Sequence, residues 1–259
     1  FGPAFLPALA GSPFYWDENT SWSHPANFAS LSELKIPDFN PQNTLWQKYK
    51  WKFLAVQEMN SEWMMSTCDL VGPFDILSGL IGNERLCIEM IENPKEIKRL
   101  AEEAVRFWFQ VYEEQYSLLK EKKGTTDIFG LFMPGRGARW SEDFIALISP
   151  KMYEDFVLPC DAEIAQFLET SYMHVHSTAL SCIEKILGNN FLKGLEISND
   201  PNGPPLEKLI TAGQKVIASG KSLMISNWQR NLKKNEIEKI YSLISFKSLI
   251  VTYEELIEN

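Results

Sequence analysis

Two of the three histidines in this 259-residue sequence, His174 and His176, lie two residues apart. The apolar run from Tyr172 to Val175 leads into them and the amphipathic segment 179–187 follows, a pattern that predicts a strand, a turn and a helix. Because side chains at i and i+2 of a strand share a face, both imidazoles should point the same way at the strand's carboxyl end. Ligands bind at that end in proteins built from strand–turn–helix units. The pair is therefore a candidate metal site, and the alternative is a pair that makes hydrogen bonds in the core.

A second candidate is the glycine-rich segment Pro134-Gly135-Arg136-Gly137-Ala138-Arg139, which follows a predicted strand at 127–133. Two arginines in a loop at a strand's carboxyl end could grip a carboxylate or a phosphate through paired N–H groups. The alternative is that both are solvated loop residues. The segment is thus a candidate site for an anionic substrate.

The composition limits the classes of protein to consider. Apolar residues make up 45% of the chain, enough for a large core, and the formal net charge is −9. With no cluster of basic and aromatic residues, we expect no nucleic-acid partner. Four cysteines lie far apart without a CxxC motif, which predicts free thiols in a reducing, cytoplasmic environment.

The sequence also gives expectations about membranes and the amino terminus. No apolar run reaches the ~18 residues that would cross a membrane. The first residues, Phe1-Gly2-Pro3-Ala4, lack the basic segment of a signal peptide and an initiator Met, a start that fits a truncated chain.

The periodicity predicts alternating strands and helices after an irregular segment that covers residues 1–60. That segment contains a short strand at 14–16 and a helix from Pro41 to Met59. From residue 61 onward we expect parallel strands, in sequential order, near 63–68, 127–133, 172–176, 193–198, 222–226 and 248–252. Helices are expected between them, at 74–81, from Asn93 to about 119, after Ser149, at 179–187, 206–218 and 234–243, with a helical turn at the carboxyl terminus. No Gly-x-Gly-x-x-Gly follows any predicted strand, which argues against a dinucleotide-binding sheet.

Five stretches together resemble the uroporphyrinogen decarboxylase superfamily. This superfamily includes tetrapyrrole decarboxylases and corrinoid-linked methyltransferases that act on coenzyme M. The stretches are DLVGPFDILSGLIG (69–82), ENPKEIKRLAEEAVRFW (92–108), DFIALISPKMYEDFVLP (143–159), YMHVHSTALSCIEKIL (172–187) and GQKVIASGKSLMI (213–225). The resemblance implies a TIM-type (β/α)8 barrel that forms one domain over residues 1–259. A closed barrel needs eight strands, so the first strand would be missing at the amino terminus. The strand at 63–68 would then have an unpaired edge, which would favour pairing with a second copy of the chain.

The resemblance also implies a metal position. In the methyltransferase branch the strand at 172–176 typically reads His-x-Cys and binds zinc together with a later cysteine. Here the two positions are His174 and His176, and no cysteine follows Cys182. A His-x-His pair is still a sound zinc pair. For the third ligand we expect Asp200, at the end of the next predicted strand, with Glu196 and Asp69 as the other candidates.

The implied chemistry is methyl transfer. Zinc would deprotonate a thiol, and the thiolate would take a methyl group from a corrinoid carried on a partner protein. Arg136 and Arg139 would meet the corrinoid's polar periphery or an acidic substrate.

Two alternatives stay open. A tetrapyrrole decarboxylase would use Asp69 or Asp143 to stabilise a protonated pyrrole intermediate, but the sequence lacks that branch's arginine-rich amino-terminal segment. The other alternative is a non-catalytic barrel that binds a small ligand.

Overall fold

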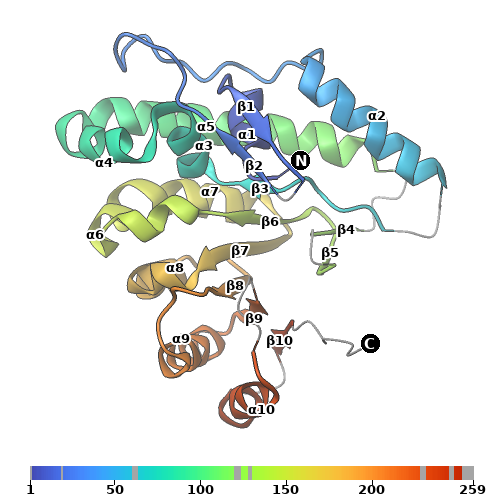
Figure 1. Ribbon diagram of the computed structural model, residues 1–259, viewed down its shortest axis with the longest axis vertical. Helices are drawn as coiled ribbons and strands as arrows, with labels where there is room; N and C mark the ends of the chain where they lie inside the picture. The colour runs from blue at the N-terminus through green and yellow to red at the C-terminus, as the bar shows by residue number, and fades with distance from the viewer. Residues whose placement is uncertain are drawn as a thin grey trace.

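The main element of the fold is a six-stranded parallel sheet (Figure 1). The computed structural model describes residues 2–18, 20–59, 64–119, 124–127, 130–227, 232–244 and 248–252. The sheet order is β10-β9-β8-β7-β6-β3, and every neighbouring pair is parallel. Its strands are β3 (Leu70–Val71), β6 (Gly137–Ser141), β7 (Thr170–His176), β8 (Gly194–Asn199), β9 (Ser222–Asn227) and β10 (Leu249–Val251). The predicted sequential order of parallel strands is confirmed.

Two strand positions differ from the prediction. The expected strand at 63–68 lies partly outside the described residues, and its described part forms only one bridge, between Ser66 and Thr126; β3 begins after it. Instead of a strand at 127–133, the chain forms an antiparallel hairpin of β4 (Gly124–Thr126) and β5 (Phe132–Pro134). The sheet strand comes later, as β6, in the segment that the sequence analysis treats as a loop. The glycines and arginines at 135–139 make this strand hard to recognise from the sequence. Its charged residue, Arg139, faces inward and pairs with the buried carboxylate of Glu196.

The sheet does not close into an eight-stranded barrel within the described residues. No pairing joins β3 to β10 there, and β1 (Phe14–Trp16), the short strand predicted at 14–16, forms a separate antiparallel hairpin with β2 (Ser21–Ser23). The structure is thus a mixed α/β fold of TIM-barrel type with an open sheet.

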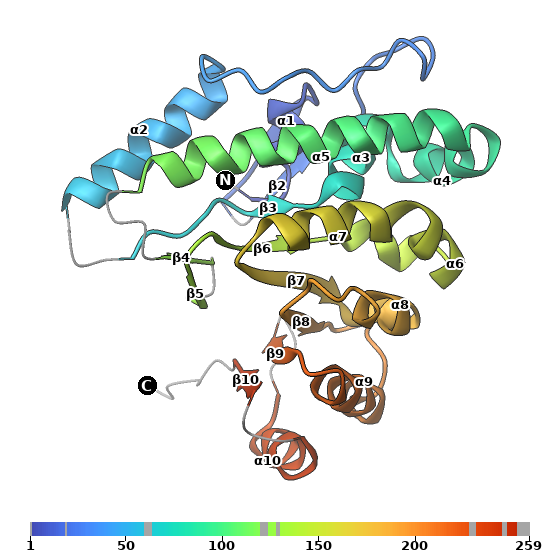
Figure 2. The ribbon, with the colours of Figure 1, turned by 180° about the vertical axis from the view of Figure 1, so that it is seen from behind.

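Helices cover one face of this sheet (Figures 1 and 2). After β3 come α3 (Pro73–Ile81), α4 (Asn83–Glu92) and α5 (Pro94–Ser117). After β6 come the 3-10 helix η1 (Asp143–Leu147), α6 (Pro150–Met152), the π-helical turn η2 (Tyr153–Val157) and α7 (Leu158–Phe167). The 3-10 helix η3 (Ser177–Cys182) and α8 (Ile183–Leu187) follow β7, α9 (Leu206–Ala218) follows β8, and α10 (Lys234–Leu243) follows β9. The helices predicted at 74–81, 93–119, 206–218 and 234–243 are confirmed, and the predicted terminal helical turn lies outside the described residues.

The amino-terminal segment packs beyond the β3 edge of the sheet. It contains α1 (Phe5–Leu9) and α2 (Thr44–Met59), the latter close to the helix predicted from Pro41. Figures 1 and 2 show α2 beside α5, where Lys50 forms an ion pair with Glu114 at 3.3 Å. The rings of Phe5, Trp46 and Tyr49 pack against one another in this layer, with centroids 5.1 to 6.4 Å apart.

The two faces of the sheet differ in chemistry because side chains alternate along each strand. The face toward the helices is apolar and buried; it carries Ala138, Trp140, Met173, Val175, Leu195, Ile197, Leu223 and Ile225. The opposite, inner face is mostly polar; it carries Arg139, Ser141, His174, His176, Glu196, Ser198 and Ser226, interrupted by Tyr172 and Met224. Burial of the apolar face holds the helices on the sheet, and the inner face is left to carry polar groups.

A buried carboxyl group joins β6 to the helical layer. Asp161 of α7 is fully buried, and its carboxylate accepts hydrogen bonds from Trp140 Nε1 at 3.0 Å and from Tyr153 Oη at 2.8 Å. Burial raises the pKa of Asp161 to about 7, although both hydrogen bonds act to lower it.

The raised pKa of Asp161 predicts a pH dependence of stability. A carboxyl group whose pKa is higher in the folded state favours folding below its unfolded pKa, and this contribution is lost as the pH rises through the folded pKa. The contribution of Asp161 to the free energy of unfolding should therefore fall between pH 4 and pH 7, by at most about 1.4 kcal/mol per pH unit. Asp161→Asn should reduce this slope, because an amide does not ionise in this pH range. The amide can still accept from Trp140 and donate to Tyr153, so the fold should be kept. Urea denaturation at several pH values measures the slope. Equal slopes for the unchanged protein and the Asp161→Asn variant would contradict a raised pKa of Asp161 in the folded state.

Candidate metal site

The carboxyl ends of the parallel strands meet at one edge of the sheet, here called the carboxyl edge. His174 and His176 come from the end of β7, and Asp143 follows β6 at the start of η1. The two imidazoles lie side by side on the inner face, with ring centroids 5.1 Å apart and planes at 85°. Asp143, His174 and His176 can each offer one ligand atom within 4.8 Å of the others. The sequence prediction that both histidines share one face at this edge is confirmed.

The chemistry of these donors fits a divalent metal ion such as zinc. Imidazole nitrogen and carboxylate oxygen are both zinc ligands. Asp143 Oδ1 lies 3.5 Å from His176 Nε2, in a contact that is not aligned as a hydrogen bond. The carboxylate therefore brings a negative charge to the two imidazoles, which a bound cation would also need.

Each histidine has a carboxylate at its other ring nitrogen. His176 Nδ1 forms a hydrogen bond of 2.6 Å with Asp200 Oδ1. His174 Nδ1 lies 3.2 Å from Glu196 Oε1, in an ion contact that is not aligned as a hydrogen bond. Metal-binding histidines typically have such a carboxylate on the nitrogen that does not bind the metal. This arrangement leaves the Nε2 atoms for coordination.

Asp200, the expected third ligand, therefore has an orienting position. Besides His176, its carboxylate accepts hydrogen bonds from Ser177 N at 2.7 Å, Ser177 Oγ at 2.8 Å and Ser198 Oγ at 3.0 Å. Burial alone would raise its pKa, but the hydrogen bonds from His176 and Ser177 lower it to about 2. The carboxylate grouped with the two histidines is Asp143, for which the sequence suggested only the stabilisation of a protonated pyrrole intermediate.

Asp143 and Asp200 together make His176 strongly basic. Interaction with Asp143 first, and with Asp200 second, raises the pKa of His176 to about 10, against the opposing effect of burial. Asp75 of α3 in turn fixes the start of η1, because its carboxylate accepts the backbone N–H groups of Asp143 and Phe144, both at 2.8 Å. Sequence reasoning missed Asp75; the only available signal was an acidic residue in the first turn of a predicted helix.

Arg139 lies inside the sheet and not in a loop. It points from β6 to the inner face, where its guanidinium pairs with Glu196 and lies 3.7 Å from Asp127 Oδ2 and 3.9 Å from Asp69 Oδ1. Burial alone would raise the pKa of Glu196, but His174 and Arg139 hold it well below its usual range. Asp69, the other expected catalytic carboxylate, is largely buried, and burial raises its pKa despite Arg139. Arg139 is thus engaged with carboxylates of the chain itself.

Arg136 lies at the opposite end of β6. It pairs with Glu113 of α5, and its guanidinium carbon lies 4.8 Å from the ring centroid of Phe167 and 5.6 Å from that of Tyr116. Since Arg136 precedes β6, it is at the amino-terminal end of the strand, in the helical layer. The expectation that both arginines meet an anionic substrate at the carboxyl edge therefore has no support in their positions.

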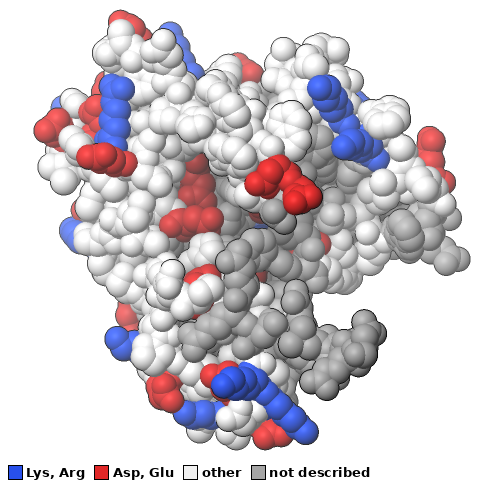
Figure 3. All heavy atoms as spheres, in the orientation of Figure 1, with Lys and Arg blue, Asp and Glu red and all other residues white. Residues whose placement is uncertain are grey.

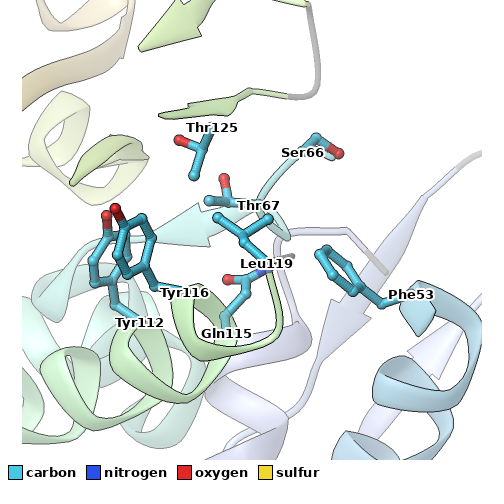
Figure 4. A pocket seen from close by; sticks show the side chains of 8 residues that line it. All are labelled: Phe53, Ser66, Thr67, Tyr112, Gln115, Tyr116, Leu119 and Thr125. Carbon is cyan, nitrogen blue, oxygen red and sulfur yellow. The ribbon is translucent and has the colours of Figure 1, made fainter. Parts of the chain in front are cut away.

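A cavity of about 360 Å³ lies beside Asp143. Its wall comes from the amino-terminal segment and β2, from α3 and from η1. Figure 3 shows acidic side chains near the middle of this face of the molecule, with Lys and Arg side chains toward its periphery. A separate pocket around Phe53, Tyr112 and Thr125 has no room for a water molecule, so it offers no ligand site (Figure 4).

Comparison with solved structures finds proteins of similar fold. No protein-family model matches the sequence, and no curated protein matches it. A solved structure of a methyltransferase from Methanosarcina mazei is similar, with a TM-score of 0.59 and 12% sequence identity, over 86% of this chain and 71% of the other. At this identity the likeness establishes a shared fold. None of the described helices is long and apolar enough to span a membrane.

The buried pair of Arg139 and Glu196 predicts a large loss of stability when one partner is removed. Arg139→Met should lower the free energy of unfolding by about 3–5 kcal/mol, because Glu196 stays buried without its cation. The matched control is Arg136→Met, whose exposed ion pair should contribute at most about 1 kcal/mol. Urea denaturation compares them, and similar losses for the two variants would contradict the role given to Arg139.

The site geometry also predicts metal binding. His176→Ala should abolish tight zinc binding without unfolding the protein, and His24→Ala, which changes the third histidine, should leave zinc binding unchanged. Asp200→Asn should weaken zinc binding by about 10- to 100-fold, because it loses the carboxylate that orients His176. Competition with a chromophoric chelator measures the affinities. A protein with both His174 and His176 replaced by Ala that still binds zinc normally would rule out the site.

Proposed function

We propose that this protein is a metal-dependent methyltransferase in which Asp143, His174 and His176 hold a zinc ion. The observation that carries the proposal is the grouping of Asp143, His174 and His176 at the carboxyl edge, where each offers a ligand atom within 4.8 Å of the others. Catalytic groups in barrels of this type lie at that edge. The fold shared with the Methanosarcina mazei methyltransferase supports the choice of reaction.

The residues of the chain would do three things in this reaction. Asp200 and Glu196 would hold the imidazoles in position, Asp75 would hold the backbone that carries Asp143, and the cavity beside Asp143 would receive a substrate. When bound, zinc would lower the pKa of a thiol ligand and so supply a thiolate nucleophile near neutral pH. Three protein ligands leave the fourth position of a tetrahedral ion open for that thiol.

In more detail, we propose that the protein belongs to the uroporphyrinogen decarboxylase superfamily. The methyl group would be supplied by a corrinoid on a partner protein. It rests on the five sequence stretches at 69–82, 92–108, 143–159, 172–187 and 213–225. The open carboxyl edge and the neighbouring cavity are compatible with a large methyl carrier that approaches from outside.

The structure favours this reaction over decarboxylation of a tetrapyrrole. A substrate with several carboxylates needs several cationic groups, but Arg139 is paired with Glu196 and Arg136 with Glu113. None of the residues that the structure places around the cavity is Lys, Arg or His. Substrate carboxylates would therefore meet an acidic surface.

Methyl transfer to a thiol tests the proposal directly. Zinc-loaded protein should transfer the methyl group of free methylcobalamin to 2-mercaptoethanol, measured by the change in the corrinoid spectrum. The protein treated with a chelator and the Asp143→Ala variant should both lose this activity, whereas Asp155→Ala, which changes an exposed carboxylate on η2, should keep it. Equal rates with and without zinc would refute the proposal.

A further inference from the structure

The cavity beside Asp143 offers no cationic group to a ligand. None of its described lining residues is Lys, Arg or His. Arg85 lies on α4, the helix that begins in the cavity wall, but it is engaged elsewhere. Its Nε lies 3.3 Å from Glu89 Oε1, and its guanidinium carbon lies 4.3 Å from the ring centroid of Phe28. An anionic ligand would leave water for a wall without a counter-charge, which costs free energy.

The two carboxylates in the same wall are already engaged with groups of the chain itself. Both oxygens of Asp75 accept backbone N–H groups, those of Asp143 and Phe144, at 2.8 Å. Asp143 Oδ1 faces the His176 imidazole at 3.5 Å. A cationic ligand would therefore compete with these groups for its counter-charge. The described wall thus favours an uncharged ligand over an ion of either sign.

The polar groups that remain in the wall are uncharged. They are three hydroxyl groups and one amide, on Ser21, Ser23, Ser78 and Asn83. Ser21 Oγ accepts the backbone N–H of Ala4 at 3.2 Å, a bond that leaves its own hydroxyl proton to donate. Ser78 Oγ donates to Asn83 Oδ1, a bond that uses the oxygen of the amide and not its two N–H groups. Such groups pair with a hydroxyl or an amide on a ligand.

The rest of the wall is largely apolar, and the space is small. Apolar side chains from β3 and η1 line it: Val71, Phe144, Ala146 and Leu147. A volume of about 360 Å³ is at the small end of the range for ligand pockets, roughly 300–1,000 Å³. On the α3 side the wall cannot recede, because a Cβ atom added at Gly79 would lie 2.6 Å from Pro7 Cβ. The cavity suits a short chain with an apolar part and an uncharged polar part.

We infer that this cavity selects an uncharged thiol as the methyl acceptor, a short chain with a hydroxyl or amide group and no acidic or ammonium group. The hydroxyl or amide would pair with the serines and Asn83, and the chain would pack on Val71 and Phe144. The thiol would lie toward Asp143, the residue that the cavity shares with the candidate metal site.

This inference rests on the proposed function and deepens it by naming the class of acceptor. In the transfer, the thiol would release its proton to solvent and its sulfur would form a bond to the methyl carbon. The carbon–cobalt bond would break, with its electron pair left on the corrinoid. Selection by the cavity wall requires neither the metal nor the transfer, so binding and reaction can be measured separately.

Three thiols of nearly equal size and different charge test the selection on metal-free protein. They are uncharged 3-mercaptopropionamide, the 3-mercaptopropionate anion and the 3-aminopropanethiol cation, each titrated at pH 7 and followed by NMR. The amide should bind roughly 10-fold or more tightly than either ion, because each ion would lose water without gaining a free counter-charge. The inference is wrong if either ion binds as well as the amide, or if none of the three binds.

Methyl transfer by the zinc-loaded protein separates this inference from the proposed function. With methylcobalamin as donor, kcat/KM should also be roughly 10-fold higher for the amide than for 3-mercaptopropionate. Equal values for the two thiols would overturn the inference and leave the proposed function standing. Transfer to neither thiol, by a protein that still selects the amide in binding, would overturn the proposed function and support the selectivity of the cavity.

A charge change in the wall gives a gain that misfolding cannot imitate. Asn83 is the first residue of α4 and lines the cavity. Asn83→Lys should strengthen the binding of 3-mercaptopropionate by roughly 10-fold, since it supplies the missing counter-charge, and should weaken that of the amide. Ile88→Lys is the matched control, because Ile88 is exposed on the same helix and does not line the cavity. Equal effects of the two changes on the binding of the anion would place the thiol elsewhere and overturn the inference.

Discussion

The ion pair between Arg139 and Glu196 is the interaction on which the inner face of the sheet depends. Both side chains are almost completely buried, and Ser226 Oγ donates a further hydrogen bond to Glu196. A buried ion pair is favourable only when hydrogen bonds satisfy its remaining polar atoms. These bonds connect β6, β8 and β9 and so favour a single alignment of the three strands, because a shift by one residue would turn Arg139 and Glu196 toward the apolar helical layer.

The same alignment creates the candidate metal site. With Arg139 and Glu196 on the inner face, the parallel register places Ser141 beside His174 and His176 beside Ser198. Asp200 follows β8 directly and Asp143 lies two residues after the end of β6, and the two carboxylates contact His176 through different ring nitrogens. Each potential ligand is oriented by a neighbour: Asp200 binds His176, Glu196 contacts His174, and Asp75 holds the backbone of Asp143. Such support lowers the cost of ordering the ligands when a cation binds.

Sequence periodicity predicted the parts of the fold that depend on local pattern. Apolar stripes predicted the helices, and short apolar runs predicted β7, β8, β9 and β10, because each of these segments buries one apolar face. The spacing of His174 and His176 was enough to place both on one face of a strand. It could not identify the third ligand, because Asp143 and Asp200 both follow strands and only the register shows which one faces Nε2 of His176. Arg139 was assigned to a loop because its charge and the flanking glycines obscure a strand whose inward face is polar. Barrel closure was equally out of reach, since it depends on pairing between β3 and β10, which lie far apart in the sequence.

Asp143 belongs to both the metal site and the cavity, and this shared position links their electrostatics. Its Oδ1 faces the two histidines, while the residue also lines the cavity. A divalent cation with one carboxylate and two neutral imidazoles carries a net charge of about +1, and a thiolate in the fourth position would bring it to zero. The charge of such a site would favour an anionic fourth ligand, such as a thiolate, over a neutral thiol. The carboxylate of Asp143 sets this charge and also lines the wall against which a substrate would lie.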